Sequence, residues 1–338
     1  MSKLTVLLVY GGESSEHDVS LKSARNVYAA LDNDKYNVQL CYIDRHGKWW
    51  LTNSIDGSHI SQPQLFPALG QRQFIAIPGN NVIRPDVVLP ILHGTYGEDG
   101  TVQGLCELLH LPCVGPNIIG AAVTMDKDMT KRLLRDAGIP VVPWRVWHAS
   151  DTKPTHDELV HELGGVLFVK PSRAGSSVGV SKVTSAAGLS SALWAAAEHD
   201  NVVLIEQAIS AREIELAVLG NNEPIVSEAG EIHPGDEFYS YEDKYSSTST
   251  SRSSIPADLP SEMTVTMQQY ALDAYRATGC RGMARVDFFV DPHNHMYLNE
   301  INSIPGFTNI SMYPKLWHEQ GIKYPELIDK LISLALEK

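Results

Sequence analysis

The chain is poor in cysteine, and its cysteines form no local pairs. Its 338 residues include four cysteines, none of them in a C-x-x-C motif. Such sparse spacing fits neither a disulfide framework nor a zinc site. We therefore expect buried or neutral thiols in a reducing compartment at Cys41, Cys106, Cys113 and Cys280.

Positive charge and long apolar runs are also scarce. There are 27 Lys and Arg against 40 Asp and Glu, a formal net charge of −13. This balance argues against non-specific binding to nucleic acids or anionic membranes, which needs concentrated basic side chains. No apolar run approaches the ~18 residues of a membrane span, and the first residues form a strand-like segment without a leader-type apolar region. We expect a soluble cytoplasmic protein of two or three domains that binds neither nucleic acid nor membrane.

Two common nucleotide-binding motifs are missing. The chain contains no G-x-x-x-x-G-K-[ST], and no G-x-G-x-x-G follows its first predicted strand. The second absence weakens a dinucleotide-binding interpretation, so a nicotinamide-dependent dehydrogenase is a poor candidate.

Strand and helix patterns alternate in the first third of the chain. Leu4–Tyr10, Val38–Ile43 and Asp86–Leu92 have the composition of buried strands, and Val19–Leu31 that of a helix. Continuous apolar strands separated by helices predict a parallel sheet covered on both faces. The residues Gln62–Asn81 are rich in Pro, Gly and Gln, and we predict a loop there.

The rest of the chain mixes short strands with helices, which predicts an α/β unit followed by α+β units. Asp236–Pro260 is polar and has little periodicity, so we expect a mobile or functional loop. The predicted helices are Met125–Ala137, Ala186–His199, Thr264–Thr278 and Tyr324–Leu336.

A hairpin over Ala284–Glu300 is the most informative segment. If its turn pairs Asp291 with Met296, then Phe289 faces Leu298, and further along Asp287 faces Glu300 and Arg285 faces Asn302.

Period-two alternation then gathers Arg285, Asp287, Glu300 and Asn302 on one face of the hairpin. Directly opposed carboxylates repel one another, so a positive group should compensate them. Two carboxylates and an amide oxygen form a hard-oxygen set that suits Mg²⁺. The alternative is a solvated hairpin face.

A second candidate is the small-residue loop of Lys170–Val180, K-P-S-R-A-G-S-S-V-G-V. Its backbone N–H groups and hydroxyls can approach a phosphate closely, although a Gly/Ser hairpin loop is also common for structural reasons. Together with Lys127 at a helix start and the acidic hairpin, the loop points to nucleoside-triphosphate chemistry.

Three more segments are candidates for substrate contacts. Gly11–Ser20 and His93–Gly100 each follow a strand at its carboxyl end, where open α/β sheets place ligands. A lone histidine there, such as His93, is more often structural than catalytic. The third segment starts the long polar loop, where Tyr239, Tyr241, Lys244 and Tyr245 are consistent either with a lid over an anionic ligand or with a solvated loop.

Seven short motifs follow one another along nearly the whole chain. They are Gly11-Gly12-x-Ser14-x-Glu16-x-x-Val19-Ser20, His93-Gly94-x-x-Gly97-Glu98-Asp99-Gly100, Met125-Asp126-Lys127, Gly175-Ser176-Ser177-Val178-Gly179, Phe238-Tyr239-x-Tyr241-x-x-Lys244-Tyr245, Arg285-Val286-Asp287 and Asn299-Glu300-Ile301-Asn302-x-x-Pro305-Gly306. Each motif alone is weak, but seven in this order are specific: the chain resembles the D-alanine–D-alanine ligases of the ATP-grasp superfamily.

The resemblance implies a Rossmann-like, pre-ATP-grasp parallel-sheet domain followed by a two-part α+β ATP-grasp fold. We expect an N-terminal substrate-binding domain over residues 1–122 and a central ATP-grasp subdomain over 123–212. The C-terminal subdomain, 213–338, would carry the lid loop 236–260.

The resemblance also implies a reaction. ATP phosphorylates the carboxylate of one D-alanine, the amine of a second attacks the acyl phosphate, and D-alanyl-D-alanine, ADP and phosphate are released. Such an enzyme acts in peptidoglycan precursor synthesis.

Roles carried over by position are likewise implications of the resemblance. The phosphates would meet Lys127, Lys170, Lys244 and the loop residues Ser176, Ser177 and Val178. Adenine would lie against Glu206, Gln207 and Ile209, with Glu213 on the ribose. Two Mg²⁺, for which Mn²⁺ can substitute, would be held by Asp287, Glu300 and Asn302.

Substrate contacts are implied in the same way. Glu16 would bind the first ammonium group, Arg285 and the Gly306 N–H the first carboxylate and the tetrahedral oxyanion, and Ser311 and Met312 the second carboxylate. Glu16, Ser176 and Tyr245 would form a hydrogen-bonded triad that holds the lid. Val19 and His93 are further substrate-site candidates.

The second substrate is open, because relatives make D-alanyl-D-lactate or D-alanyl-D-serine. Tyr245 favours D-alanine, since depsipeptide-forming relatives lack this tyrosine. A nucleotide-binding regulator without catalysis is an alternative from another class. A homodimer is expected from the resemblance.

Overall fold

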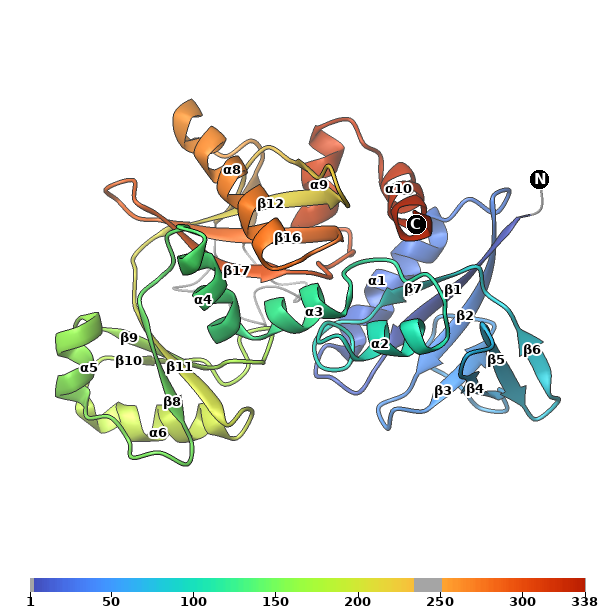
Figure 1. The fold of residues 1–338 in the computed structure, drawn as a ribbon, viewed down its shortest axis with the longest axis horizontal. Coiled ribbons are helices and arrows are strands. Elements are labelled where there is room, and N and C mark those ends of the chain that lie inside the picture. The colour runs from blue at the N-terminus through green and yellow to red at the C-terminus, as the bar shows by residue number, and fades with distance from the viewer. Residues whose placement is uncertain (1–2, 234–250, 338) are drawn as a thin grey trace.

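The computed structural model describes residues 3–233 and 251–337, and within them the chain forms three β-sheets with helices packed on them (Figure 1). The sheets follow one another along the chain. The N-terminal sheet lies at one end of the molecule, and the central and C-terminal sheets form two further lobes. No helix in the described part of the chain is long and apolar enough to cross a membrane.

The N-terminal sheet has the strand order β6-β5-β4-β3-β2-β1-β7. Its centre is parallel, as predicted, because β1 (Leu4–Gly11) pairs in parallel with β2 (Tyr36–Ile43) and with β7 (Val87–Ile91). The other strands extend it in antiparallel fashion: β3 (Trp49–Thr52), β4 (Gln64–Ala68), β5 (Gln73–Ile77) and β6 (Asn81–Ile83).

Both faces of β1 are buried, which explains its unbroken apolar sequence. Val6, Leu8 and Tyr10 belong to the apolar cluster on the side of α1 (His17–Ala30). Leu7 and Val9 belong to the cluster on the side of α2 (Thr101–Leu108). Because β1 and β7 are parallel neighbours, the loops that follow them lie side by side at the carboxyl edge of the sheet.

The prediction of a loop over Gln62–Asn81 is wrong, because β4 and β5 lie within it. Leu65, Phe74 and Ala76 are buried and alternate with more exposed neighbours, as in a sheet with one covered face. The prediction relied on the content of Pro, Gly and Gln in this segment. It gave too little weight to the short alternation of apolar and polar residues that marks the two strands.

The central sheet is antiparallel throughout, in the order β10-β9-β11-β8. On one face Leu167, Val169, Val203 and Ile205 pack with α5 (His156–Leu163) and α6 (Ala186–Ala197). The alternate side chains therefore point to the opposite face. The strands are β8 (Trp144–His148), β9 (Leu167–Pro171), β10 (Ser181–Val183) and β11 (Val202–Gln207).

The C-terminal sheet has the order β15-β14-β12-β16-β17, with β13 paired to β12. Its strands are β12 (Arg212–Gly220), β13 (Ile225–Val226), β14 (Gly230–His233), β15 (Arg252–Ser254), β16 (Gly282–Val290) and β17 (Met296–Asn302). The long helix α8 (Ser261–Ala277) covers one face, and α9 (Met312–Glu319) and α10 (Tyr324–Leu336) follow the sheet.

The helix predicted over Met125–Ala137 is present, and a separate helix that was not predicted precedes it. α3 (Ile118–Met125) ends and α4 (Lys127–Asp136) begins at Asp126, whose carboxylate accepts the N–H groups of Asp128 and Met129, both at 3.1 Å. An aspartate in this position is a favourable N-cap. The break places Lys127 at the first turn of α4.

The predicted hairpin is present, but part of its register differs. Asp287 faces Glu300 and Arg285 faces Asn302, as predicted. Nearer the turn, however, Val290 pairs with Met296, so the predicted pairing of Asp291 with Met296 is wrong.

The predicted pairing of Phe289 with Leu298 is also wrong, because Leu298 lies opposite Phe288. A β-bulge absorbs the difference: Asp287 pairs with Glu300 and Phe288 with Leu298, which leaves Asn299 as the extra residue. The bulge brings the acidic residues into register although the turn is one residue tighter than predicted.

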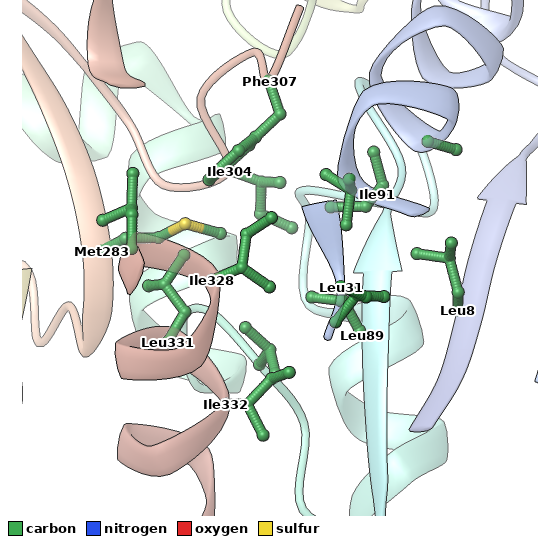
Figure 2. Close-up of a cluster of buried hydrophobic side chains, with 14 of the residues drawn as sticks. Leu8, Leu31, Leu89, Ile91, Met283, Ile304, Phe307, Ile328, Leu331 and Ile332 are labelled. Carbon is green, nitrogen blue, oxygen red and sulfur yellow. The ribbon is translucent and has the colours of Figure 1, made fainter. Parts of the chain in front are cut away.

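The N-terminal and C-terminal sheets share one apolar core. Figure 2 shows Leu89 and Ile91 of the first lobe beside Ile304, Ile328 and other C-terminal side chains, and all belong to a single cluster. At its edge Asp329 of α10 accepts hydrogen bonds from Lys35 Nζ at 2.5 Å and Tyr36 Oη at 2.9 Å. The core of the central sheet is a separate cluster.

Candidate active site

A cavity of about 440 Å³ lies between the inner faces of the central and C-terminal sheets, with loops of the N-terminal lobe at one end. Val19 does not line it, being buried within α1. Lys244 and Tyr245 lie outside the described residues. All other predicted site residues line it: Glu16, His93, Lys127, Lys170, Ser176, Ser177, Val178, Glu206, Gln207, Ile209, Glu213, Arg285, Asp287, Glu300, Asn302, Gly306, Ser311 and Met312.

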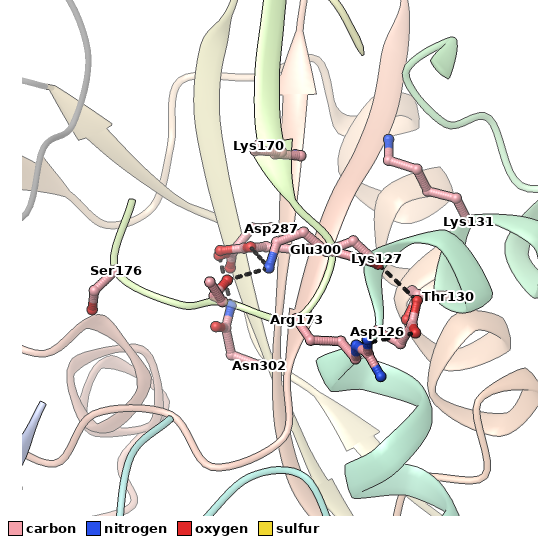
Figure 3. Close-up of polar contacts among 12 residues, drawn as sticks. Asp126, Lys127, Thr130, Lys131, Lys170, Arg173, Ser176, Asp287, Glu300 and Asn302 are labelled. Carbon is pink, nitrogen blue, oxygen red and sulfur yellow. Dashed lines mark hydrogen bonds and ion pairs between the residues drawn. The ribbon is translucent and has the colours of Figure 1, made fainter. Parts of the chain in front are cut away.

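The acidic hairpin forms one wall of the cavity. Arg285 donates from Nε and Nη2 to the carboxylate of Asp287 at 2.8 and 2.7 Å. Asn302 Nδ2 donates to the same carboxylate at 2.9 Å (Figure 3). Glu215 Oε2 lies 3.1 Å from Arg285 Nε. Burial alone would lower the pKa of Arg285, but Asp287 and Glu215 outweigh it and raise that pKa above its ordinary value.

The donor set of this wall fits a hard divalent cation. Asp287 and Glu300 present carboxylate oxygens from adjacent strands, and Asn302 adds an amide group two residues beyond Glu300. Mg²⁺ is usually bound through one or two carboxylates, with substrate phosphates and waters completing its shell. In the described parts of the chain no group of three or more His, Cys, Asp or Glu side chains is arranged to hold a metal ion. Two carboxylates and an amide are therefore the chemistry available here.

Lys127 bridges the two sheets across the cavity. Its Nζ donates to the carbonyl of Ala174 at 2.7 Å and lies 4.0 Å from Glu300 Oε2. Burial lowers the pKa of Lys127, and the charge of Glu300 opposes that effect. The capping of α4 by Asp126 positions this lysine, and Ser172 Oγ donates to the same Asp126 carboxylate at 2.8 Å.

Lys170 extends from β9 on the same inner face as Glu206 of β11. The two groups form an ion pair, with Lys170 Nζ 2.7 Å from Glu206 Oε2. A second lysine, Lys131, is 3.0 Å from the other carboxylate oxygen. Sequence reasoning missed Lys131, although its position four residues after Lys127 places both on one face of α4.

The small-residue loop closes the cavity toward the N-terminal lobe. Ser176 donates a hydrogen bond from its hydroxyl to the carboxylate of Glu16, 160 residues away in the sequence. Ser176 and Ser177 have φ angles of 51° and 61°, a left-handed conformation that is uncommon for residues other than glycine. The loop is therefore held in a demanding conformation beside the cavity, where strained backbone is often functional.

The floor of the cavity comes from the loop after β7. Ser14 Oγ donates to the His93 carbonyl at 2.6 Å, and His93 Nε2 lies 3.3 Å from Ser23 Oγ. Burial lowers the pKa of His93, so a neutral imidazole is favoured.

Glu98 is a cavity residue within the candidate substrate segment His93–Gly100, to which the sequence analysis assigned no role of its own. Its carboxylate accepts the Gly94 N–H at 2.6 Å, and burial together with the charge of Glu16 raises the pKa of Glu98 to about 8. Glu215 was missed as well, although alternation along β12 places it on the same face as Glu213.

The loop after β17 lines the cavity beside the N-terminal lobe. A Cβ atom on Gly306 would come within 2.8 Å of Ser311 Oγ, so a larger residue would require the Ser311 side chain to move. Ser311 Oγ also accepts the Thr308 N–H at 3.0 Å, and it immediately precedes α9 and Met312. The backbone of Gly306 is thereby held against the start of α9.

A Rossmann-like lobe followed by two sheets that enclose lysines and paired carboxylates defines an enzyme of the ATP-grasp class. Family models agree: that for the D-ala D-ala ligase N-terminus matches residues 5–116 and that for the D-ala D-ala ligase C-terminus matches residues 133–333. The chain belongs to the D-alanine–D-alanine ligase family, and it is an ATP-dependent ligase.

Individual relatives are similar over their full length. The D-alanine–D-alanine ligase of Proteus mirabilis is 47% identical over 352 residues, covering 100% of this chain and 96% of its own. D-alanine–D-alanine ligase A of Escherichia coli K12 is 44% identical over 353 residues, covering 100% and 97%.

Solved structures show the same architecture. The D-alanine–D-alanine ligase of Coxiella burnetii superposes with a TM-score of 0.90 at 39% identity, over 99% of this chain and 94% of its own. The VanG D-Ala:D-Ser ligase of Enterococcus faecalis superposes with a TM-score of 0.89 at 34% identity, over 99% and 100%. Enzymes of this family use ATP and a divalent metal.

Proposed function

We propose that this enzyme joins two molecules of D-alanine to D-alanyl-D-alanine at the expense of ATP, for peptidoglycan precursor synthesis. The observation that carries the proposal is the convergence of Lys127, Arg285, Asp287 and Glu300 in one cavity whose loop is tied to Glu16. A carboxylate oxygen of the first D-alanine attacks the γ-phosphorus of ATP, and ADP leaves. The amine of the second attacks the acyl carbon, the bond to phosphate breaks, and the amine loses a proton.

The nucleotide is assigned to the space between the central and C-terminal sheets. Lys127 and Lys170 would neutralise phosphate charge, and Ser177 and Val178 would cover the phosphates. Adenine would lie against Glu206, Gln207 and Ile209, with Glu213 at the ribose and Lys244 adding a phosphate contact. Lys170 is buried and the Lys127 side chain is only 13% exposed at the cavity wall, which supports this, since charge neutralisation and positioning are what phosphoryl transfer requires.

Two Mg²⁺, replaceable by Mn²⁺, are assigned to Asp287, Glu300 and Asn302. When bound, they would neutralise charge on the transferred phosphoryl group. The hard-oxygen chemistry of the three side chains supports this assignment. We expect EDTA to abolish ADP release and added Mg²⁺ or Mn²⁺ to restore it; activity that survives exhaustive chelation would contradict the assignment.

The substrates are assigned to the end of the cavity nearest the N-terminal lobe. Glu16 would bind the first ammonium group. Arg285 and the Gly306 N–H would bind the first carboxylate and stabilise the developing oxyanion. Ser311 and Met312 would meet the second carboxylate, and His93 would line the site with Val19 behind it. Arg285 is suited to this role because Asp287 and Glu215 hold its guanidinium in a fixed orientation.

The second substrate has a competing candidate, because the similar Enterococcus faecalis structure is that of a D-Ala:D-Ser ligase. D-lactate is the other alternative. Tyr245, on which the preference for D-alanine rests, lies outside the described residues. Product identification is therefore needed to separate the three.

The decisive experiment measures ADP release and product mass with ATP, Mg²⁺ and each of D-alanine, L-alanine, D-serine and D-lactate. We expect release with D-alanine alone, no release with L-alanine, and D-alanyl-D-alanine as the main product of mixtures. A mixed product that dominates would favour the alternative. If the protein binds nucleotide but turns over none of the four compounds, the result would support the alternative of a nucleotide-binding regulator without catalysis.

We also propose that the domains meet at residues 122 and 212. The three sheets support these limits, because each sheet is built from strands within one of the three ranges, apart from Arg212 at the start of β12. α4 falls in the central range but packs through Leu134 on the core of the C-terminal sheet. We also place the enzyme in the cytoplasm, where ATP is available.

A homodimer is proposed through the outer part of the N-terminal sheet. Phe66, Ile75 and Val82 are neighbours across β4, β5 and β6, and Phe66 and Val82 are each 41% exposed. An apolar row of this kind on one sheet face can cover its counterpart in a second copy. Sedimentation velocity should give a dimer and Phe66→Asp a monomer; a monomeric wild type at micromolar concentration would contradict the proposal.

A further inference from the structure

Lys131 is a buried charged residue that no role assigned above explains. It lies in the middle of α4, and only 1% of its side chain is exposed. Its Nζ is 3.0 Å from Glu206 Oε1, donates to the Val142 carbonyl at 3.2 Å, and lies 5.7 Å from the centre of the Trp144 ring.

A lysine in such a place is costly for the protein. Removing an ammonium group from water is unfavourable unless a partner compensates it, and a methionine would fill similar space without that cost. The compensating partner is Glu206, which is itself 4% exposed. The stability of the fold alone therefore does not account for this ion pair.

The ion pair connects the C-terminal lobe with the central sheet. α4 packs through Leu134 on the core of the C-terminal sheet, whereas Glu206 belongs to β11 of the central sheet. Lys131 thus reaches from the C-terminal lobe to the central sheet, beside the cavity that the central and C-terminal sheets enclose.

Glu206 receives two lysines, one at each oxygen. Lys131 faces Oε1, and Lys170 Nζ is 2.7 Å from Oε2. Among the described residues, Oε1 has no hydrogen-bond partner with good geometry, so the charge of Lys131 is its main compensation. Burial alone would raise the pKa of Glu206, but Lys131 and Lys170 outweigh it and lower that pKa, which keeps the carboxylate ionised.

We propose that Lys131 is a positioning residue for the nucleotide: together with Lys170 on the other oxygen, it holds the Glu206 carboxylate in one orientation at the cavity wall. An ionised, fixed carboxylate only accepts hydrogen bonds, so it favours a purine with an exocyclic amino group at position 6 over one with a carbonyl oxygen there. Lys131 then contributes to ATP affinity and to discrimination against GTP without touching either nucleotide. This inference rests on the nucleotide position in the proposed function.

The first test is a double-mutant cycle of Lys131→Met and Glu206→Gln. We expect Lys131→Met to raise KM for ATP by about ten- to a hundredfold, the scale of one hydrogen bond to a charged group, and to reduce the preference for ATP over GTP. kcat and KM for D-alanine should change much less. Because Lys131 acts through Glu206, adding Lys131→Met to Glu206→Gln should cost little more.

Lys153→Met is the matched control, because Lys153 is an exposed lysine of the central lobe whose Nζ contacts Ser190 and the Trp194 ring. We expect wild-type KM for ATP and wild-type selectivity from it. Lys131→Gln serves as a second variant if Lys131→Met folds poorly, since it keeps a donor near Glu206 without the charge.

The outcomes separate a positioning role from a structural one. An unchanged KM for ATP in a folded Lys131 variant, or fully additive effects in the cycle, would overturn the inference. So would a loss of thermal stability with no change in ATP-over-GTP preference.

If the wild type releases no ADP with D-alanine, the proposed function fails. Lys131 is then tested by calorimetric binding of adenylyl imidodiphosphate alone, where Lys131→Met should still bind more weakly and equal binding would overturn the inference.

Discussion

Asp287 and Glu300 lie directly opposite one another on β16 and β17, and their carboxylates are balanced by different cations. Asp287 is held by Nε and Nη2 of Arg285, whereas Lys127 Nζ is 4.0 Å from Glu300. Like charges in directly opposed positions destabilise a sheet. The pair therefore lowers the stability of the folded protein, and we infer that it is retained for catalysis. Because the two carboxylates have different cationic partners, substitutions at Asp287 and Glu300 should have different effects.

Glu300→Gln should greatly reduce turnover and spare the fold. The variant loses a charged oxygen at the phosphoryl end, which we expect to lower kcat by about 10²- to 10³-fold. It also removes the repulsion with Asp287, so thermal stability without ligands should be unchanged or higher. Asp287→Asn is the comparison, because it deprives Arg285 of a partner and should lower stability as well. Parallel losses of activity and stability in Glu300→Gln would contradict this.

Ser176→Ala should uncouple the small-residue loop from the N-terminal lobe. The lost hydrogen bond to the Glu16 carboxylate predicts a fall in kcat/KM for D-alanine of about ten- to a hundredfold. Thermal stability should barely change, because Ser176 is only partly buried. Ser191→Ala, which removes an exposed hydroxyl on α6, is the control. Steady-state kinetics of both variants test this, and wild-type kinetics in Ser176→Ala would remove the contact from the mechanism.

Glu98 should make stability depend on pH. Its pKa is about 8 in the folded protein because of burial and the charge of Glu16, against an ordinary value of 4.5. The folded state therefore holds a proton that the unfolded state releases. The bound proton therefore contributes to the free energy of unfolding. This contribution is fully present below pH 4.5, the ordinary pKa of a glutamate, and is lost as the pH rises to about 8.

Glu98→Gln carries a permanently neutral amide in place of the protonated carboxyl. Its stability should therefore fall less than that of the wild type between pH 5 and 9, measured by urea unfolding without metal or nucleotide. Identical pH profiles for the two proteins would show that Glu98 is ionised throughout.

Ile328→Ala tests the core that the first and last lobes share. Ile328 is 2% exposed in that cluster, so truncation should cost about 2–5 kcal/mol. Hydrogen exchange should quicken in β1 and β16, which both border the cluster, and much less in β11, whose core is separate. Ile60→Ala, at a side chain 82% exposed, should change stability by less than about 0.5 kcal/mol. Equal protection changes in all three strands would mean that the lobes unfold as one unit.

Much of the fold could be predicted because local patterns carry it. The doubly buried strand Leu4–Gly11 and the alternating hairpin follow from the spacing of their apolar residues. The β4–β5 pair was missed because turn-forming residues hid a short alternation, and the hairpin bulge because no local signal marks Asn299 as the extra residue.

The sequence by itself determined which residues share a strand face, because side-chain alternation is a property of the backbone. Arg285 and Asp287 therefore share one face of β16, and Glu300 and Asn302 share one face of β17, but the bulge at Asn299 is what sets Asp287 opposite Glu300. The sequence could not determine that bulge or what crosses from one sheet to another. The contact of Ser176 with Glu16, the reach of Lys131 from α4 to Glu206 and the burial that raises the Glu98 pKa depend on how three sheets pack together. Only the tertiary structure decided these, because desolvation and long-range charge pairing arise from the packed assembly.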